Sequence, residues 1–179
     1  MKKRILVIIA IISCILSNNS FSQSGFSWDR VLVGGNFGAS LGSVETSVAL
    51  SPNIGYRITE RFTLGTGVIY QYYRYRNSVF DVKFNNYGAK LFGTFQLNDF
   101  LILHSEYESL NIDYVTFNSL GNPDGTRQKT IGSMFVGGGY RQYSSDNTMF
   151  DIMLLYNLTE TPYTPYANPT IRVGFSIGL

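Results

Sequence analysis

Residues 101–108 have the sequence LILHSEYE, in which apolar and polar side chains alternate. One face of an extended segment here carries Leu101, Leu103, Ser105 and Tyr107, and the other carries Ile102, His104, Glu106 and Glu108. A period of two residues is typical of a β-strand with two different faces. Such a strand fits a barrel wall that turns its apolar face to lipid and its polar face to the lumen.

The same alternation recurs in seven other segments of the chain. They are residues 31–41, 46–58, 62–75, 86–97, 131–141, 150–158 and 170–179. The chain also has 18 glycines, which helices disfavour, and 13 tyrosines and 13 phenylalanines, which strands favour. The predicted fold class is therefore all-β, an eight-stranded antiparallel up-and-down transmembrane β-barrel.

Ionisable side chains near the middle of these segments all fall on the face opposite the apolar one. They are Arg57, Lys90, His104, Glu106, Glu108, Arg141, Asp151 and Arg172. A soluble lipocalin-like barrel, the alternative, would turn its charges outwards and bury its large apolar side chains. Here the inner face is rich in Gly, Ser, Asn and charge, so we predict a luminal polar network rather than a dry core.

The connections between the predicted strands alternate between short and long. Residues 59–61, 98–99 and 143–147 form the short set, and residues 76–83, 113–129 and 159–168 form the long set. Outer-membrane barrels have short periplasmic turns and longer external loops, so the long set is predicted to be external. Only the first external loop, residues 42–45, is short.

Aromatic residues and prolines gather in or near two of the long connections. They are Tyr114, Phe117, Pro162, Tyr163, Pro165 and Tyr166. Two interpretations stay open: an external contact surface for a partner, or part of the aromatic belt at the membrane interface.

The N-terminus has the plan of a secretory signal peptide. A basic start is followed by the apolar run Ile5–Leu16, and Ser20-Phe21-Ser22 supplies the small residues of a cleavage site. We predict a signal peptide over residues 1–22 and a barrel domain over residues 23–179. The apolar run is too short for a spanning helix, which needs about 20 residues. A retained helix and lipidation at Cys14 are the alternatives.

Removal of residues 1–22 changes the charge and the chemistry of the chain. The 14 basic residues fall to 11, against 12 acidic residues, so the mature chain has a charge of about −1. No basic patch favours nucleic acid. Cys14 is the single cysteine, so the mature chain has no disulfide or thiolate metal site. We predict no cofactor and no metal.

The last strand carries a specific resemblance. Arg172, Gly174, Ile177 and Leu179 have the spacing of the C-terminal signal that the barrel assembly machinery recognises, although the usual terminal aromatic is replaced by Leu179. The eight-strand layout resembles the small OmpA/OmpX-like barrels, and in particular outer-membrane β-barrel proteins of Bacteroidota. The resemblance implies export to a Gram-negative outer membrane and contact with outer-membrane lipids, lipopolysaccharide and the barrel assembly machinery.

Three classes of function follow from these observations. The leading one is a plugged barrel with a structural or interaction role: membrane integrity, display of surface loops, or membership of a larger outer-membrane complex. The second is a narrow channel for small solutes, because luminal glycines leave space. The third is an enzyme acting on lipid, or a metal site, at His104, Glu106 and Glu108. Against an enzyme, Ser105 points away from His104, so we predict no catalytic residues.

Overall fold

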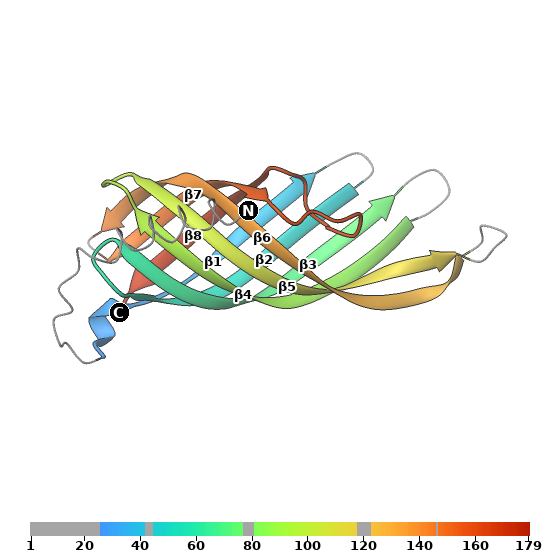
Figure 1. Ribbon diagram of the computed structural model, residues 1–179, viewed down its shortest axis with the longest axis horizontal. Coiled ribbons are helices and arrows are strands. Elements are labelled where there is room, and N and C mark those ends of the chain that lie inside the picture. The colour runs from blue at the N-terminus through green and yellow to red at the C-terminus, as the bar shows by residue number, and fades with distance from the viewer. Residues whose placement is uncertain (1–25, 42–44, 77–80, 118–122, 146) are drawn as a thin grey trace, which may run out of the picture.

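The computed structural model describes residues 26–41, 45–76, 81–117, 123–145 and 147–179. These residues form eight antiparallel strands, each paired with its neighbours in the sequence, and β8 pairs back with β1 to close the barrel (Figure 1). The strands are β1 (Val31–Leu41), β2 (Glu45–Arg57), β3 (Phe62–Arg76), β4 (Asp81–Gln96), β5 (Leu101–Phe117), β6 (Pro123–Ser145), β7 (Thr148–Asn157) and β8 (Thr170–Gly178). The predicted fold class is confirmed.

The outer surface of the barrel is apolar, as the alternation predicts. Leu91 is 62% exposed, Val68 60% and Ile171 60%, and each lies on the face opposite the luminal charges. Between them the wall is covered with further exposed aliphatic and aromatic side chains. A continuous apolar outer surface around a polar interior is the arrangement of a barrel that crosses a lipid bilayer.

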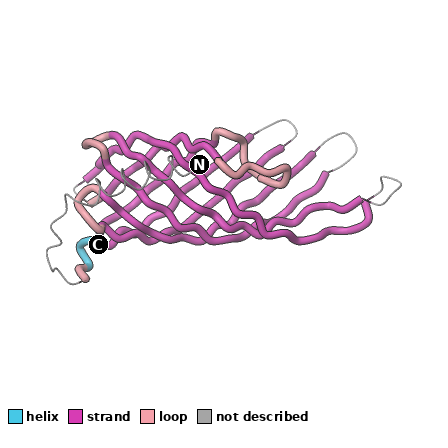
Figure 2. The backbone as a smooth tube through the Cα atoms, viewed as in Figure 1, coloured by secondary structure: helices cyan, strands magenta, loops and turns pink. Residues whose placement is uncertain are grey.

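The two ends of the barrel differ (Figure 2). The short-turn end holds residues 58–61, residues 97–100 and the connection from Ser145 to Thr148, together with the 3₁₀ helix η1 (Trp28–Arg30). The hairpin end holds the connections that join β1 to β2, β3 to β4, β5 to β6 and β7 to β8. The turns at the short-turn end are closed by local hydrogen bonds, such as that from the Leu101 amide to Asn98 Oδ1 at 2.8 Å.

Strands at the hairpin end are longer than predicted. Residues 113–129 were expected as a loop, but β5 continues to Phe117 and β6 begins at Pro123, with the ladder unbroken from Leu101↔Tyr140 to Thr116↔Gly125. Figure 1 shows this hairpin extending beyond the barrel. In the same way, β4 begins at Asp81 within the predicted loop at residues 76–83. At the start of β4 the alternation has the opposite polarity, because Asp81, Lys83 and Asn85 are exposed whereas Val82 and Phe84 are half-buried, as expected for strands that extend out of the lipid into water.

An aromatic cluster lies beside the wall at the short-turn end. Phe26 stacks on Tyr56 at 5.5 Å between ring centroids and meets Trp28 edge-on at 5.1 Å. The Ser27 amide also donates to the Tyr56 hydroxyl at 3.3 Å. Phe26 and Trp28 are mostly exposed, as amphipathic aromatic rings are at the level of lipid headgroups.

The predicted signal peptide at residues 1–22 and Cys14 lie outside the described residues. Within the described ranges, no helix is long and apolar enough to cross a membrane.

Candidate functional site

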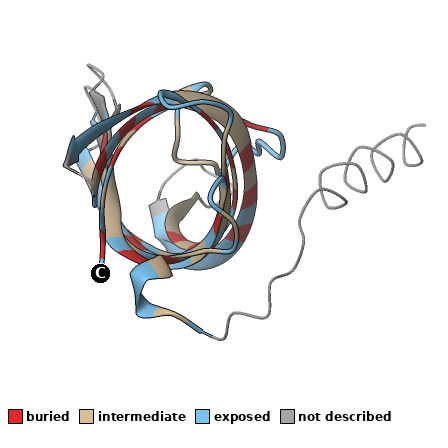
Figure 3. Ribbon diagram, turned by 90° about the vertical axis from the view of Figure 1, so that its left-hand side faces the viewer, coloured by how far each residue is buried: buried red, intermediate tan, exposed pale blue. Residues whose placement is uncertain are grey.

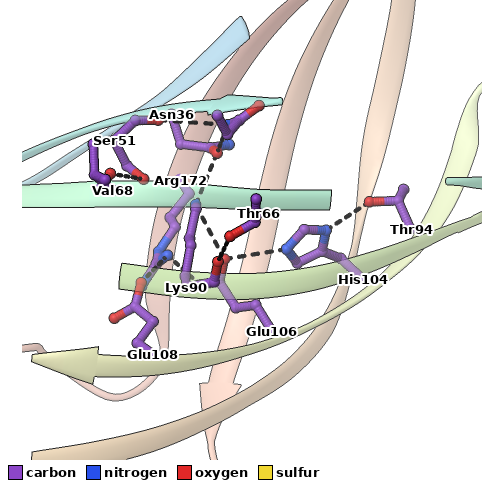
Figure 4. A network of polar contacts seen from close by, with 11 residues as sticks. Asn36, Ser51, Thr66, Val68, Lys90, Thr94, His104, Glu106, Glu108 and Arg172 are labelled. Atoms are coloured by element: carbon purple, nitrogen blue, oxygen red, sulfur yellow. Dashed lines mark hydrogen bonds and ion pairs between the residues drawn. The ribbon is translucent and has the colours of Figure 1, made fainter. Parts of the chain in front are cut away.

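Five charged or titratable side chains meet inside the barrel, halfway along it. Lys90 comes from β4, His104, Glu106 and Glu108 from β5, and Arg172 from β8 (Figure 4). Each occupies a position that strand alternation turns inwards, and each is at most 6% exposed. Besides His104, the group contains two cations, Lys90 and Arg172, and two carboxylates, Glu106 and Glu108, whose charges balance one another.

Glu106 is the centre of this luminal network. Its Oε2 accepts a hydrogen bond from Lys90 Nζ at 3.2 Å and lies 3.3 Å from His104 Nε2. Its Oε1 accepts from Arg172 Nη1. One carboxylate therefore links β5 to the adjacent β4 and, across the lumen, to β8.

Arg172 extends the network to a second carboxylate and to aromatic rings. Its Nη1 donates to Glu108 Oε1 at 2.7 Å. Its guanidinium carbon lies 4.7 Å from the ring centroid of Phe135 and 5.5 Å from that of Tyr166. Arginine is suited to this position because its planar group stacks on rings while donating several hydrogen bonds in one plane.

Lys90 connects the network to the first two strands. Besides Glu106, its Nζ donates to Asn36 Oδ1 at 2.9 Å, and the same oxygen accepts from Asn53 Nδ2 at 2.8 Å. The asparagines were not singled out from the sequence, although both stand on the inward face of their segments. Only the closed barrel brings β1 within reach of β4.

His104 is fully engaged by neighbouring groups. Because a carboxylate only accepts, Nε2 donates to Glu106, and Nδ1 then accepts from Thr94 Oγ1 at 2.9 Å. The imidazole also stacks on Phe92. No group of three His, Cys, Asp or Glu residues in the described ranges is arranged to hold a metal ion. Both ring nitrogens therefore have a hydrogen-bond partner among the described residues.

The remaining predicted network residues lie nearer the short-turn end. Arg141 on β6 forms a bidentate pair with Asp151 on β7, with both contacts at 2.8 Å. Arg57 differs from the prediction: it is half-buried at the end of β2 and forms no ion pair with a described residue. Its position at the barrel mouth, where water solvates a cation, is the physical reason that it needs no partner.

The interior is more apolar than predicted. Two clusters lie on the inner face, one formed by Ile69, Leu110, Ile112 and Ile131 and the other by Ile102, Phe135, Met153 and Leu155. Tyr166 packs against both, with its ring meeting Phe135 edge-on at 5.5 Å. The inward face is thus polar at the network and apolar on either side of it.

Tyr166 was predicted to belong to an external contact surface, and the structure places it inside the barrel. The β7–β8 connection lies across the interior (Figure 3). The buried Gln71 side chain fixes it by donating to the Pro165 carbonyl at 3.1 Å. The two inner clusters attract the ring because they offer apolar surface that is otherwise open to water.

Tyr163 and Pro162, two other predicted contact residues, are exposed. The Tyr163 ring lies 5.4 Å from that of Tyr114, and Lys129 Nζ stands 3.9 Å above it. Pro162 is exposed in the same connection, and Phe117 ends β5.

Little free volume remains around the network. Cavities of about 20 Å³ and about 30 Å³ flank it, and each has room for one or two water molecules. At some luminal glycines the neighbouring strand leaves no room for a side chain: a Cβ at Gly137 would lie 2.0 Å from the Leu154 carbonyl oxygen, and one at Gly88 would lie 2.1 Å from that of Ser109. These glycines allow close approach of neighbouring strands in a tightly curved wall.

The residues of the predicted assembly signal lie on both faces of β8. Arg172 and Gly174 point into the lumen, where Gly174 is paired with Asn36 on β1. Ile177 and Leu179 are exposed on the lipid side, and the Leu179 amide donates to the Val31 carbonyl at 3.1 Å.

Comparisons with known proteins give similarity in architecture at low sequence identity. No protein-family model and no curated protein matches the chain. A crystal structure of Ail, the attachment invasion locus protein of Yersinia pestis, in complex with a heparin analogue, is 13% identical, covers 83% of this chain and 93% of its own, and has a TM-score of 0.48. The N-terminal β-barrel domain of Pseudomonas aeruginosa OprF is 15% identical, covers 83% and 95%, and has a TM-score of 0.44.

These TM-scores lie below 0.5, so the fold assignment rests on the closed strand ladder itself. The closed ladder confirms that the chain has the fold of a small eight-stranded membrane barrel, as the resemblance implies.

Proposed function

We propose that the chain is a plugged outer-membrane barrel with a structural or interaction role. The observation that carries the proposal is the network of Lys90, Glu106, Glu108 and Arg172, which crosses the lumen and is flanked by two water-sized cavities. At eight strands the interior is just wide enough for side chains to fill it.

The hairpin end supports an interaction role. The β5–β6 hairpin projects beyond the barrel, and residues 124–130 of β6 are all exposed. A hairpin held away from the membrane is suited to contact a partner such as a larger outer-membrane complex, while the barrel wall contacts lipids and lipopolysaccharide. Insertion by the barrel assembly machinery through Arg172, Gly174, Ile177 and Leu179 belongs to the same proposal.

Planar-bilayer recording distinguishes this function from the channel. The purified full-length barrel is expected to leave the bilayer current at its baseline, because charged and aromatic side chains fill the lumen. An eight-stranded barrel of known conductance, inserted under the same conditions, provides the positive control. Steady ohmic conductance from this chain would instead support a channel for small solutes.

Limited proteolysis of intact cells tests the proposed orientation, in which the hairpin end is external. Protease is expected to cut within residues 113–129, which include residues 118–122, outside the described part. Cleavage confined to residues 98–99 or 144–145 at the short-turn end would reverse the orientation.

Intact mass of the protein extracted from membranes tests its processing. A mature chain that begins at Gln23 is expected, whereas a diacylated chain that begins at Cys14 would replace this proposal with a lipoprotein.

A further inference from the structure

A cavity of about 330 Å³ opens at the short-turn end of the barrel, apart from the luminal network. This volume lies within the range of small-molecule sites. Four arginines line it: Arg30 of η1, Arg57 of β2, Arg61 of the β2–β3 turn and Arg141 of β6. Segments far apart in the sequence thus bring four guanidinium groups to one opening.

Three of these arginines have hydrogen-bonding capacity to spare. Arg141 is held by Asp151, whereas Arg30, Arg57 and Arg61 form no ion pair with any residue in the described ranges. The lining also contains Asp29 and Glu60, which are exposed, as is Arg61, whereas Arg30 and Arg57 are half-buried. The inner part of the cavity is therefore cationic, and its protein walls strengthen the field acting on an anion.

The neighbouring aromatic cluster indicates where this cavity lies relative to the membrane. Phe26, Trp28 and Tyr56 have the character of headgroup-level residues, and Arg30 follows Trp28 by two positions in the same short segment. The opening of the cavity is thus close to the level of lipid phosphates and is also accessible from the aqueous phase. Guanidinium groups bind phosphate in a bidentate manner, with two parallel hydrogen bonds.

We propose that Arg30, Arg57 and Arg61 form a binding site for a phosphate group at the short-turn end. The group comes from a soluble phosphate or from a phospholipid headgroup, and the chemistry of recognition is the same in both cases. The site does not depend on the lumen being plugged, because it lies outside the network.

Nuclear magnetic resonance of the full chain in a non-ionic, phosphate-free detergent tests the site. Inorganic phosphate is expected to shift the guanidinium Nε–H signals of Arg30, Arg57 and Arg61 saturably, and sodium chloride of equal ionic strength is not. The double variant Arg57→Gln/Arg61→Gln is expected to weaken binding about tenfold or more, since it removes charge-assisted hydrogen bonds. Arg76→Gln/Arg127→Gln removes the same charge at the hairpin end, from two arginines that form no ion pair with a described residue, and is the matched control.

A second experiment identifies the source of the phosphate group. It uses the protein in nanodiscs, in a buffer that contains no phosphate. If the three signals shift with phosphatidylglycerol lipid and added phosphate no longer moves them, a headgroup occupies the site. If they respond to added phosphate as in detergent, the ligand is soluble. Absence of a saturable shift in both settings, or an equal response from the Arg57→Gln/Arg61→Gln variant, would overturn the proposal. The gel mobility of unheated samples shows that each variant is folded.

Discussion

Positively charged side chains lie both in the middle of the lumen and at the short-turn end, but the two regions differ in whether these side chains have ionic partners. Lys90 and Glu106, whose side chains are 0% and 1% exposed, belong to a network in which every charge has an opposite partner. At the short-turn end, Arg30, Arg57 and Arg61 lack such partners. A charge removed from water must be paired, whereas one at the mouth keeps its hydration. Depth along the barrel therefore decides which charges hold the fold together and which are free to bind a ligand.

The largest effect is expected from Glu106→Gln. This change leaves Lys90 and Arg172 with one carboxylate between them, and should lower the free energy of unfolding by roughly 3–5 kcal/mol. The measurement is the temperature at which the detergent-folded barrel loses its fast-migrating gel form. Glu60→Gln, at the exposed turn, is the control. An unchanged temperature would show that the network does not hold the barrel together.

A charge-balanced variant sharpens the same test. Lys90→Met combined with Glu106→Gln removes one charge of each sign, so it should be less destabilised than Glu106→Gln alone. If the double variant is instead the less stable of the two, uncompensated positive charge is not the cause of the loss.

Tyr166→Ala is expected to have the next largest effect. Loss of the ring that packs against both inner clusters should lower the free energy of unfolding by roughly 1.5–3 kcal/mol. It should also make the β7–β8 connection more susceptible to protease. Tyr163→Ala, in the same connection but with its ring half-exposed at the surface, should change both properties much less. Equal effects from the two tyrosines would mean that the ring does not anchor the connection.

Asp151→Asn tests the intermediate case, because the pair with Arg141 is close to the short-turn end and its side chains are 8% and 10% exposed. Loss of the bidentate contact should lower the free energy of unfolding by roughly 1–3 kcal/mol. Asp99→Asn, in the turn between β4 and β5, is the control. A loss larger than that of Glu106→Gln would contradict the relation between depth and pairing.

The smallest effect is expected from Arg57→Gln in phosphate-free buffer. Since Arg57 has no ionic partner among the described residues, the free energy of unfolding should stay within about 0.5 kcal/mol of the wild type. Urea unfolding in lipid vesicles measures this difference. A marked loss would mean that Arg57 contributes to the fold through contacts other than ion pairs.

Strand number and the two faces of the wall could be predicted from the sequence, because lipid on one side and lumen on the other impose a strict alternation. The ends of β5 and β6 could not, since residues 113–117 and 123–129 lie beyond the region where that alternation is enforced. The inward position of Glu106 was evident, but its bond to Arg172, 66 residues away, depends on barrel closure. Tyr166 was predicted outside because a proline-rich connection gives no indication of which apolar surface it will cover.

The ladder between β1 and β8 is the shortest in the barrel. It contains six residue pairs in the described ranges, against seventeen between β5 and β6. The strands on either side of it are also the most distant in sequence, so their contact carries the highest contact order and forms after the local hairpins. We therefore expect closure to be a late step of folding, and we expect this short seam to be the weakest part of the finished wall. Gly174 and Ile177 lie in that seam, paired with Asn36 and Val33 of β1.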